Sequence, residues 1–463
     1  MMSSLPLHFV PGSATAQLLA EMQAFLQLPQ LQEHRNCGFL VACSGGSDSC
    51  ALLWAAAHAA VVEGIRLEVV TVDHGIRPTS FHDADFVEAL CVRLGLVCHR
   101  GRLEMPVNAG ENELRDARYA FFEDCMRKRN LGALLLGHTA EDQAETVLLH
   151  LLRGTGLRGL GAMRDIDGVR LRPFLERKKE QLRAFLRDLG ETWCEDESNE
   201  QDKYLRNRVR RGLLLWMQKE NPRIVESLCR TARLARCEHD AVVEFAQRRL
   251  SSSRVQVFAG RVEALRLADW LQDPEGVRLV VLRRWWRYLA PAGAELPASQ
   301  VEAVYHDLVN DGVCMRDLPG PVRLTADHGW IVLSVPGSLP NTHVTFQISH
   351  DGVAHTQNHE SVDLVRDAQG DIVLPIVAFP LTLRPPAPGD RYRQAPERLV
   401  RCKKRLERLP RGLRPHAWVF ADSYGVVWWQ MFVSEPCELL DGTLRFHLEL
   451  AGQRVPVRLP DTL

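Results

Sequence analysis

The residues best suited to chemistry form one short run, Ser44-Gly45-Gly46-Ser47-Asp48-Ser49. This run follows an apolar segment, residues 39–43, and opens an alanine- and leucine-rich stretch with helical character. Two adjacent glycines let backbone N–H groups approach a phosphate closely, and a helix N-terminus adds a favourable dipole. A capping turn would explain serine and glycine alone. The complete run after a strand predicts a phosphate-binding loop, and it lacks the GxxxxGK[ST] pattern of a Walker A loop.

A second group of polar side chains follows another apolar run, residues 133–136. At about 100° per residue, His138, Asp142 and Glu145 fall within about 60° of one another on the helix that comes next. Glu141 lies between the two faces of this helix, and no role follows for it. The opposite face is apolar and is expected to be buried; it holds Ala140, Ala144, Val147, Leu148 and Leu151. A solvated polar face is the alternative explanation for the three polar side chains.

The elements that must position these groups alternate between short β-rich runs and longer helical stretches over the first 160 residues. The predicted strands are residues 39–43, 67–72, 96–100 and 133–136. Strands interleaved with helices predict an α/β fold with a parallel sheet, whose ligands bind at the carboxyl ends of the strands. Asp73 and His74 also follow a strand end, where a turn that caps the strand is the alternative explanation.

Length and composition exclude several classes of protein. The 463 residues are 46% hydrophobic and 25% charged, which is typical of a globular protein with about three domains. The net charge of −1 argues against a uniformly basic nucleic-acid binder but does not show where the charges lie. The longest nearly uninterrupted apolar run, residues 50–62, is shorter than the ~20 residues that span a bilayer. The start of the chain lacks a secretory signal, so we expect a cytoplasmic protein with no membrane partner.

Twelve cysteines are present, and no two of them are separated by only two residues. The sequence therefore has no CxxC motif for zinc or redox chemistry. In a long cytosolic chain such cysteines are expected to be reduced and mostly buried thiols.

The glycine–serine run resembles the PP-loop of the N-type ATP pyrophosphatases, which cleave ATP between the α and β phosphates. Further motifs resemble those of one family in that superfamily, the tRNA(Ile)-lysidine synthases. These motifs are VDHGIR (72–77), the set Glu113, Arg115, Arg118 and Tyr119, GHTAEDQAET (137–146), RGTG (153–156) with GL (159–160), DESN (196–199), RNRVR (206–210) and residues 388–415. One departure stands out: the first aspartate of the family's DD pair is Glu141 here, one methylene longer.

The resemblance implies a parallel-sheet PP-loop ATPase domain and a specific reaction. ATP would adenylate the carbon-2 oxygen of the wobble cytidine in an isoleucine tRNA with a CAU anticodon. The ε-amine of free L-lysine would then attack carbon 2 and expel AMP, which gives lysidine. The modified tRNA would read AUA instead of AUG and carry isoleucine instead of methionine. ATP as a substrate, Mg²⁺, this tRNA and lysine are the expected partners, and a homodimer stays open.

The resemblance also assigns roles within the site. The expected ATP-binding residues are Ser44, Gly45, Gly46, Ser47, Asp48, Ser49, Asp73 and His74. Asp48 would also help to organise Mg²⁺ around the phosphates. We expect Asp142 and Glu145 to recognise lysine or a metal. Arg115 would stabilise phosphate or developing charge, and His138 would be a base or an adenylate contact. A base is expected because the lysine amine, with a pKa of ~10.4, must lose a proton before it attacks.

Two basic segments are predicted to contact tRNA phosphates. Residues 203–211 hold five positive residues and no acidic one, and the expected contacts are Arg206, Arg208, Arg210 and Arg211. A solvated helix face is the alternative. Residues 384–414, which include Lys403 and Lys404, hold eleven Lys+Arg and three acidic residues, a net charge of +8. This segment predicts salt-sensitive tRNA binding. Trp428 and Trp429 could stack on bases, but adjacent strand residues face opposite ways, so at least one should be core.

The domain organisation follows from these changes in pattern. Residues 1–216 are the predicted PP-loop adenylating domain, with residues 1–30 as a family-atypical extension. Residues 217–340 are predicted to form a mainly helical domain that binds tRNA or substrate. Residues 341–463 are predicted to form a small α+β domain that binds tRNA.

Two alternative functions stay open. One is another PP-loop tRNA-modifying enzyme, such as a thiolase, but such thiolases commonly carry the CxxC pairs that this chain lacks. The other is a catalytically silent tRNA-binding protein that keeps the loop for structure. The presence of Asp48, Asp142 and Glu145 together disfavours it.

Overall fold

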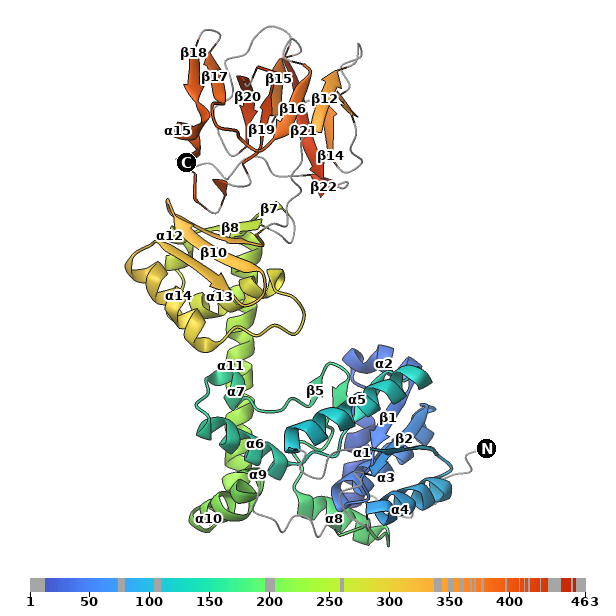
Figure 1. Cartoon of the computed structure of the whole chain (residues 1–463). Helices are drawn as coiled ribbons and strands as arrows, with labels where there is room; N and C mark the ends of the chain where they lie inside the picture. The colour runs from blue at the N-terminus through green and yellow to red at the C-terminus, as the bar shows by residue number, and fades with distance from the viewer. Residues whose placement is uncertain are drawn as a thin grey trace. The chain divides into compact units, whose positions relative to one another are not determined.

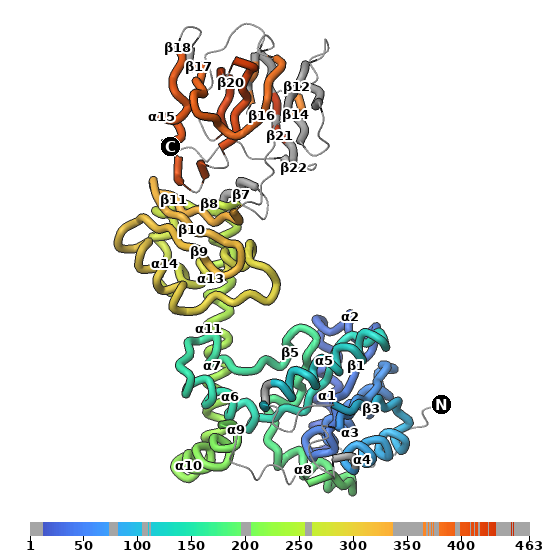
Figure 2. Tube along the Cα trace, viewed as in Figure 1, coloured from blue at the N-terminus to red at the C-terminus, as the bar shows by residue number. Residues whose placement is uncertain are grey.

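The computed structural model describes residues 13–73, 80–103, 110–195, 205–258, 262–336 and much of 344–454. His74 and the DESN motif at 196–199 lie outside the described residues. The chain forms two compact units, residues 1–239 and 240–463 (Figures 1 and 2). The division into three domains stays a prediction.

The first unit is built on a six-stranded sheet with the order β3-β2-β1-β4-β6-β5. Its strands are β1 (Phe39–Ala42), β2 (Leu67–Asp73), β3 (Val97–Arg102), β4 (Ala133–Leu135), β5 (Ile166–Asp167) and β6 (Arg170–Leu171). All neighbours are parallel except β5 and β6. This confirms the parallel α/β prediction and its four strands, whereas the short β5 and β6 were not predicted. The chain passes outward from β1 to β3 and returns to β4 on the other side of β1, so β1 and β4 flank the topological switch point.

Helices cover both faces of this sheet, which explains why its central strands β1, β2 and β4 are mostly apolar. The helices of this part of the chain are α1 (Ala14–Leu26), η1 (Pro29–Leu31), α2 (Gln32–Cys37), α3 (Ser47–Glu63), α4 (Ser80–Leu94), α5 (Glu111–Arg129), α6 (Ala140–Leu152), α7 (Leu157–Leu160) and α8 (Lys179–Asp188). Phe39 and Val41 of β1 join the apolar core with α1, α3, α4 and α8. Leu40 faces the other way and packs with α5.

Helix α1 belongs to the core of this unit. Its side chains Leu18, Leu19, Met22 and Leu26 are buried against the same cluster as β1 and α3. Residues 1–30 were expected to be an extension of the PP-loop domain. For residues 14–26 the structure shows an integral helix instead, because its apolar face covers part of the sheet.

A helical segment follows at the end of the first unit and packs on α6. It comprises α9 (Leu205–Arg208), the π-helical turn η3 (Val209–Leu213), α10 (Leu214–Glu220) and the first half of the long α11 (Ile224–Ser253), whose residues from 240 on belong to the second unit. Val209, Leu214, Val225, Leu228 and Ala232 form an apolar cluster with Ala140, Ala144, Val147, Leu148 and Leu149 of α6. Four members of the predicted buried face of α6 are therefore confirmed. The fifth, Leu151, is 49% exposed, because the cluster on this side of α6 ends at Leu149.

The second unit begins with helices and an antiparallel sheet of the order β7-β8-β11-β10-β9. Its elements are β7 (Val255–Phe258), β8 (Val262–Arg266), α12 (Leu267–Leu271), α13 (Glu275–Leu289), α14 (Ala298–Asn310), β9 (Cys314–Leu318), β10 (Val322–Asp327) and β11 (Trp330–Ser334). The helices agree with the prediction for residues 217–340, and the sheet is an addition to it. The β10–β11 hairpin turns at His328 and Gly329, with φ of 49° and 76°, as tight hairpins require.

The C-terminal region is rich in strands. One sheet has the order β13-β12-β16-β19-β20-β17-β18, and another has the order β14-β21-β15 with β22 paired to β21. The elements are β12 (Val344–Ile348), β13 (Ala354–Gln357), β14 (Val362–Arg366), β15 (Ile372–Pro375), β16 (Leu381–Arg384), β17 (Arg391–Ala395), β18 (Arg398–Arg401), α15 (Cys402–Leu406), β19 (Val419–Ala421), β20 (Val426–Gln430), β21 (Thr443–Leu450) and β22 (Gln453–Arg454). Trp428 and Trp429 on β20 are both buried, so neither is available to stack on a base.

None of the helices within the described ranges is long and apolar enough to cross a membrane. The cysteines in the same ranges are free thiols.

Candidate active site

The glycine–serine loop and His138 lie at the same edge of the sheet. The loop follows β1 and His138 follows β4, and these two strands are parallel neighbours at the switch point. The two connections also approach each other closely: a Cβ placed on Gly137 would come within 3.1 Å of the Asp48 carbonyl oxygen. The topology therefore brings together the two groups of polar residues that the sequence separates by about ninety positions.

The loop is held in shape by its own polar groups. Gly45 has a φ of +87°, and its carbonyl accepts a hydrogen bond from the Cys194 N–H at 2.9 Å. The buried Ser49 hydroxyl accepts from the Ser44 N–H at 3.1 Å and donates to the Gly46 carbonyl at 3.0 Å. Ser49 therefore holds the loop closed through its side chain, whereas the Ser44 side chain is exposed. Helix α3 begins at Ser47, so its first backbone N–H groups lie at the loop.

Asp142 is an ionised carboxylate at the start of α6. Its Oδ2 accepts hydrogen bonds from the Thr139 N–H at 3.0 Å and the Thr139 hydroxyl at 2.9 Å, which caps the helix. Burial alone would raise the pKa of Asp142. The positive charge of Lys179, together with His138 and the Thr139 N–H, outweighs burial and lowers that pKa to about 2.

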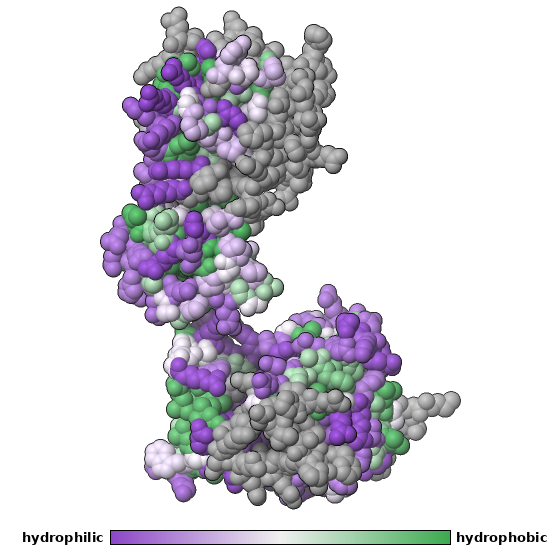
Figure 3. Space-filling model, viewed as in Figure 1, coloured by the Kyte–Doolittle hydropathy of each residue, from purple (hydrophilic) through white to green (hydrophobic). Residues whose placement is uncertain are grey.

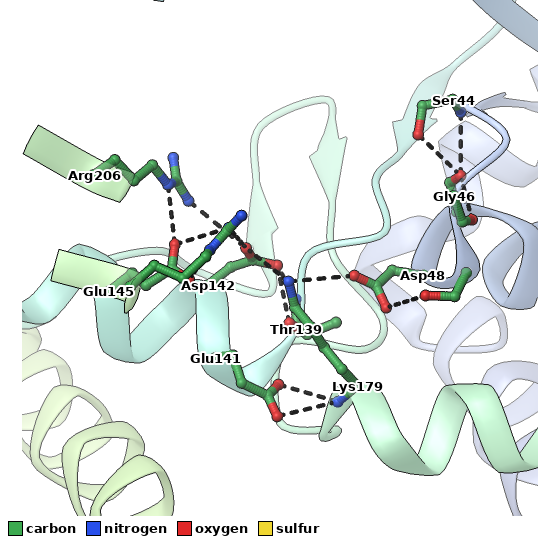
Figure 4. A network of polar contacts seen from close by, with 12 residues as sticks. Ser44, Gly46, Asp48, Thr139, Glu141, Asp142, Glu145, Lys179 and Arg206 are labelled. Carbon is green, nitrogen blue, oxygen red and sulfur yellow. Dashed lines mark hydrogen bonds and ion pairs between the residues drawn. The ribbon is translucent and has the colours of Figure 1, made fainter. Parts of the chain in front are cut away.

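Two arginines from the segment after α8 pair with the carboxylates of α6. Glu145 is almost fully buried, and its oxygens accept from Arg206 Nε at 3.1 Å and Arg210 Nε at 2.5 Å. Arg210 also forms an ion pair with Asp142 at 3.3 Å, and Figure 4 shows Arg206 beside Glu145 and Asp142. The π-helical turn η3 starts between the two arginines, and such turns are frequent at functional sites.

The four arginines of the first basic segment thus divide into two pairs. Arg206 and Arg210 are half-buried and face α6, whereas Arg208 and Arg211 are exposed. That all four contact tRNA phosphates stays a prediction. The exposed Arg208 and Arg211 are better placed to contact a phosphate than the half-buried Arg206 and Arg210.

Lys179 is a further residue of the site, and the sequence reasoning missed it. Its Nζ lies 3.5 Å from Asp48 Oδ2 and 3.7 Å from Asp142 Oδ1, between the loop and α6 (Figure 4). The only signal in the sequence was its place in a basic, helical stretch. Burial raises the pKa of Asp48, while Lys179 opposes this shift and Asp142 adds to it.

Glu141 has a clear structural role. Its two carboxylate oxygens accept the backbone N–H of Lys179 at 3.2 and 3.0 Å. Because Lys179 is the first residue of α8, the Glu141 carboxylate caps the positive end of that helix.

His138 is neutral at physiological pH. Burial lowers its pKa to about 4; Asp142 opposes this shift, and Arg172, Arg206 and Arg115 add to it. Its Nδ1 is buried and has no hydrogen-bond partner among the described residues. Arg115 is exposed on α5 and lies over the Tyr119 ring, 5.6 Å from its centroid. The positive charge of Arg115 is one of the causes that lower the pKa of His138.

The metal assignment stays a prediction. In the parts of the chain that the structure describes, no group of three or more His, Cys, Asp or Glu side chains is arranged to hold a metal ion. Asp48 and Asp142 are nevertheless two carboxylates that share one cation, Lys179. Mg²⁺ typically binds one or two carboxylates together with substrate phosphates, so these residues fit it. Asp73, the last residue of β2, is buried.

The basic segment at 384–414 presents part of its charge on the surface. Arg391 of β17 and Arg401 of β18 are direct cross-strand partners, and both are exposed. Lys403 and Lys404 on α15 are exposed beside them. The surface over β17, β18 and α15 is hydrophilic (Figure 3). Arg384 instead forms a largely buried ion pair with Asp390 at 2.7 Å, so its charge stabilises the fold and is not part of the exposed basic surface.

Known proteins with similar sequences cover most of the chain. Residues 17–216 match the PP-loop domain family. The tRNA(Ile)-lysidine synthase of Thermobifida fusca is 40% identical over 302 residues, which cover 64% of this chain and 91% of that protein. The enzyme of the same name from Enterococcus faecalis is 26% identical over 449 residues, 90% of this chain and 96% of the relative. Among solved structures, the U34-tRNA thiolase NcsA of Methanococcus maripaludis aligns over 48% of this chain and 80% of its own, with a TM-score of 0.41 and 15% identity.

Proposed function

This chain belongs to the tRNA(Ile)-lysidine synthase family of carbon–nitrogen ligases, and we propose that it makes lysidine in isoleucine tRNA. The substrates are ATP, free L-lysine and the tRNA with a CAU anticodon, and the products are lysidine, AMP and pyrophosphate. The observation that supports this proposal best is that Asp48, within the PP-loop, and Asp142, at the start of α6, lie on either side of Lys179 at the β1–β4 switch point.

The first step is activation of the cytidine. Its carbon-2 oxygen attacks the α phosphorus of ATP, the bond to the bridging oxygen breaks, and pyrophosphate leaves. The loop at 44–49 and the N-terminus of α3 hold the phosphates through backbone N–H groups, because Gly45 and Gly46 leave room for close approach. Mg²⁺, when bound, neutralises charge that builds up on these phosphates.

The second step forms the carbon–nitrogen bond. The neutral lysine ε-amine attacks carbon 2, the bond from carbon 2 to the former carbonyl oxygen breaks, and AMP leaves with that oxygen, while the nitrogen gives one proton to solvent and keeps one N–H. Asp142 is the better contact for the ammonium of lysine, because its side chain is 11% exposed whereas that of Glu145 is 1% exposed. Glu145 holds Arg206 and Arg210 in place beside it.

His138 suits a contact to the adenylate or the cytidine better than the role of base. A group with a pKa near 4 is a weak acceptor for a proton from an amine. A neutral imidazole with a buried and unpartnered Nδ1 can instead form a hydrogen bond to an incoming substrate atom.

The C-terminal basic surface supports binding of tRNA. Like charges directly opposite each other on a sheet are destabilising, and Arg391 and Arg401 are such a pair. A polyanion across β17, β18 and α15 would relieve this repulsion and contact Lys403 and Lys404 as well.

The direct test is incubation of the protein with ATP, Mg²⁺, labelled lysine and CAU-anticodon isoleucine tRNA. We expect label to enter the tRNA, and we expect Asp142→Asn to reduce incorporation by at least tenfold. Glu180→Gln, on the exposed face of α8, is the matched control and should keep full activity. Conversion of ATP to AMP without labelled tRNA would point to another PP-loop modification. Binding of tRNA without any ATP cleavage would point to a silent tRNA-binding protein.

A further inference from the structure

We propose that Lys179 supplies the cation that binds the β and γ phosphates of ATP, and that Glu141 positions it for this role. The proposal rests on the proposed function, because it assigns a contact within the same ATP site. It concerns a residue of α8 that lies outside the glycine–serine loop.

The first argument is a missing charge. The loop at 44–49 has no lysine, unlike a Walker A loop, whose lysine reaches the β and γ phosphates. Asp48 within the loop adds a negative charge where ATP would bring several more. A cation from another segment must therefore reach the loop, and Lys179 Nζ lies 3.5 Å from Asp48.

The second argument is how loosely Lys179 is held. Its distances of 3.5 and 3.7 Å to Asp48 and Asp142 are ion pairs beyond normal hydrogen-bond length. Arg206 and Arg210 instead form hydrogen bonds of 3.1 and 2.5 Å with the buried Glu145. The Lys179 ammonium can therefore move to a phosphate at little cost in free energy. If Arg206 and Arg210 moved in the same way, they would leave the buried Glu145 carboxylate unpaired.

The third argument is the backbone anchor. Glu141 accepts the Lys179 N–H with both carboxylate oxygens, so the start of α8 is fixed to the start of α6 (Figure 4). An aspartate at this position would be shorter by about 1.5 Å and would not reach the same N–H from the same backbone. The longer side chain thus couples the position of Lys179 to the helix that carries Asp142.

The experiment compares Lys179→Met, Lys179→Arg and a neighbouring control, Lys178→Met. Lys178 pairs with Glu226, so its substitution removes the same charge from the same turn of α8 at a different contact. ATP affinity is measured with Mg²⁺ but without lysine or tRNA, and KM values for ATP and lysine are then measured in the full reaction. We expect Lys179→Met to weaken ATP binding and raise the KM for ATP by about tenfold or more, with the KM for lysine within twofold. Lys179→Arg should recover most of the loss, and Lys178→Met should match the wild type.

Glu141 is tested in the same assays. Glu141→Ala should weaken ATP binding by about threefold to fivefold, because Lys179 keeps its charge but loses its anchor. Glu141→Asp should lie between Glu141→Ala and the wild type. Thermal unfolding of each variant separates this effect from loss of the fold, and Lys179→Gln provides a second uncharged variant should Lys179→Met unfold.

The outcomes separate the two proposals. Unchanged ATP affinity in folded Lys179→Met and Lys179→Gln would overturn this inference and leave the proposed function intact. A raised KM for lysine with unchanged ATP affinity would also overturn it, since Lys179 would then act on Asp142. Failure of the wild type to label tRNA, with normal ATP binding, would overturn the proposed function alone.

Discussion

The two adjacent glycines of the loop lead to different predictions for the same substitution by alanine. Gly45 has a φ of +87°, and a Cβ there would lie 3.3 Å from Cys194 Sγ and 3.4 Å from the Asp83 carbonyl oxygen. Gly46 has a φ of −70° and a ψ of 162°, and its Cβ would meet only Ser44 Oγ, at 3.7 Å. The backbone of Gly46 accepts alanine, whereas that of Gly45 does not.

The magnitude follows from the backbone. A residue with a side chain in this left-handed region costs about 1–2 kcal/mol, and the contact with Cys194 adds to it. For a unit of this size, a loss of 1 kcal/mol lowers Tm by about 2–4 °C. We therefore expect Gly45→Ala to lower the melting temperature by about 2–8 °C and Gly46→Ala to leave it unchanged or slightly higher.

Both substitutions should weaken ATP binding, for different reasons. In Gly45→Ala the loop changes its conformation, whereas in Gly46→Ala a methyl group occupies space next to the phosphates. Calorimetry and ATP titration on the same samples check the pair of results. A stable Gly45→Ala together with a destabilised Gly46→Ala would contradict the positive φ of Gly45 and the extended backbone of Gly46. Full ATP affinity in Gly46→Ala would show that phosphate does not approach the loop at this point.

Three further predictions concern other parts of the chain. Glu145→Gln should lower the free energy of unfolding in urea by about 1–3 kcal/mol, because it weakens charged hydrogen bonds to the half-buried Arg206 and Arg210. An unchanged urea midpoint would contradict these ion pairs. The pKa of His138 is about 4 in the folded chain and 6.5 in the unfolded chain, so between these pH values His138 binds a proton in the unfolded chain but not in the folded one. Up to about 3 kcal/mol of stability, present above pH 6.5, is therefore lost across this window, and His138→Gln should flatten that dependence in acid titrations. Lys403→Ala with Lys404→Ala should reduce the salt dependence of tRNA binding by about 1–2 units of slope in a log–log plot, whereas Arg127→Ala, an exposed control on α5, should not.

The sequence was sufficient to predict the elements whose signal is local. The strands at 39–42, 67–73 and 133–135 are short, mostly apolar runs followed by polar or glycine residues, so a single sequence reveals them, and the more polar strand at 97–102 was predicted from its place between two helical stretches. The placement of Asp142 and Glu145 on one face of α6 also followed from the helical period alone, whereas His138, which the same period placed on this helix, lies before it, because α6 begins at Ala140. These predictions succeeded because each depends on residues that are neighbours along the chain.

Other features depend on contacts between distant segments, and no local pattern indicates them. Lys179 is 131 positions from Asp48, and nothing in its surroundings distinguishes it from the neighbouring Lys178. Arg206 and Arg208 are of the same type and lie two positions apart, yet Arg206 is half-buried and pairs with Glu145 of α6 whereas Arg208 is exposed, since the direction of each side chain depends on how the helical segment packs. The burial of both Trp428 and Trp429 likewise depends on a second layer of packing over β20.

The charges of the site explain why a net charge of −1 says so little about function. Asp48, Asp142 and Glu145 face three cations from other segments, Lys179, Arg206 and Arg210. The site is thus balanced before any substrate binds, and ATP makes it strongly negative. That excess favours Mg²⁺ and a cationic second substrate, which must come close to Asp142 once Lys179 has turned to the phosphates. Lysine, whose side chain ends in the same ammonium as Lys179, is suited to take the position that Lys179 leaves.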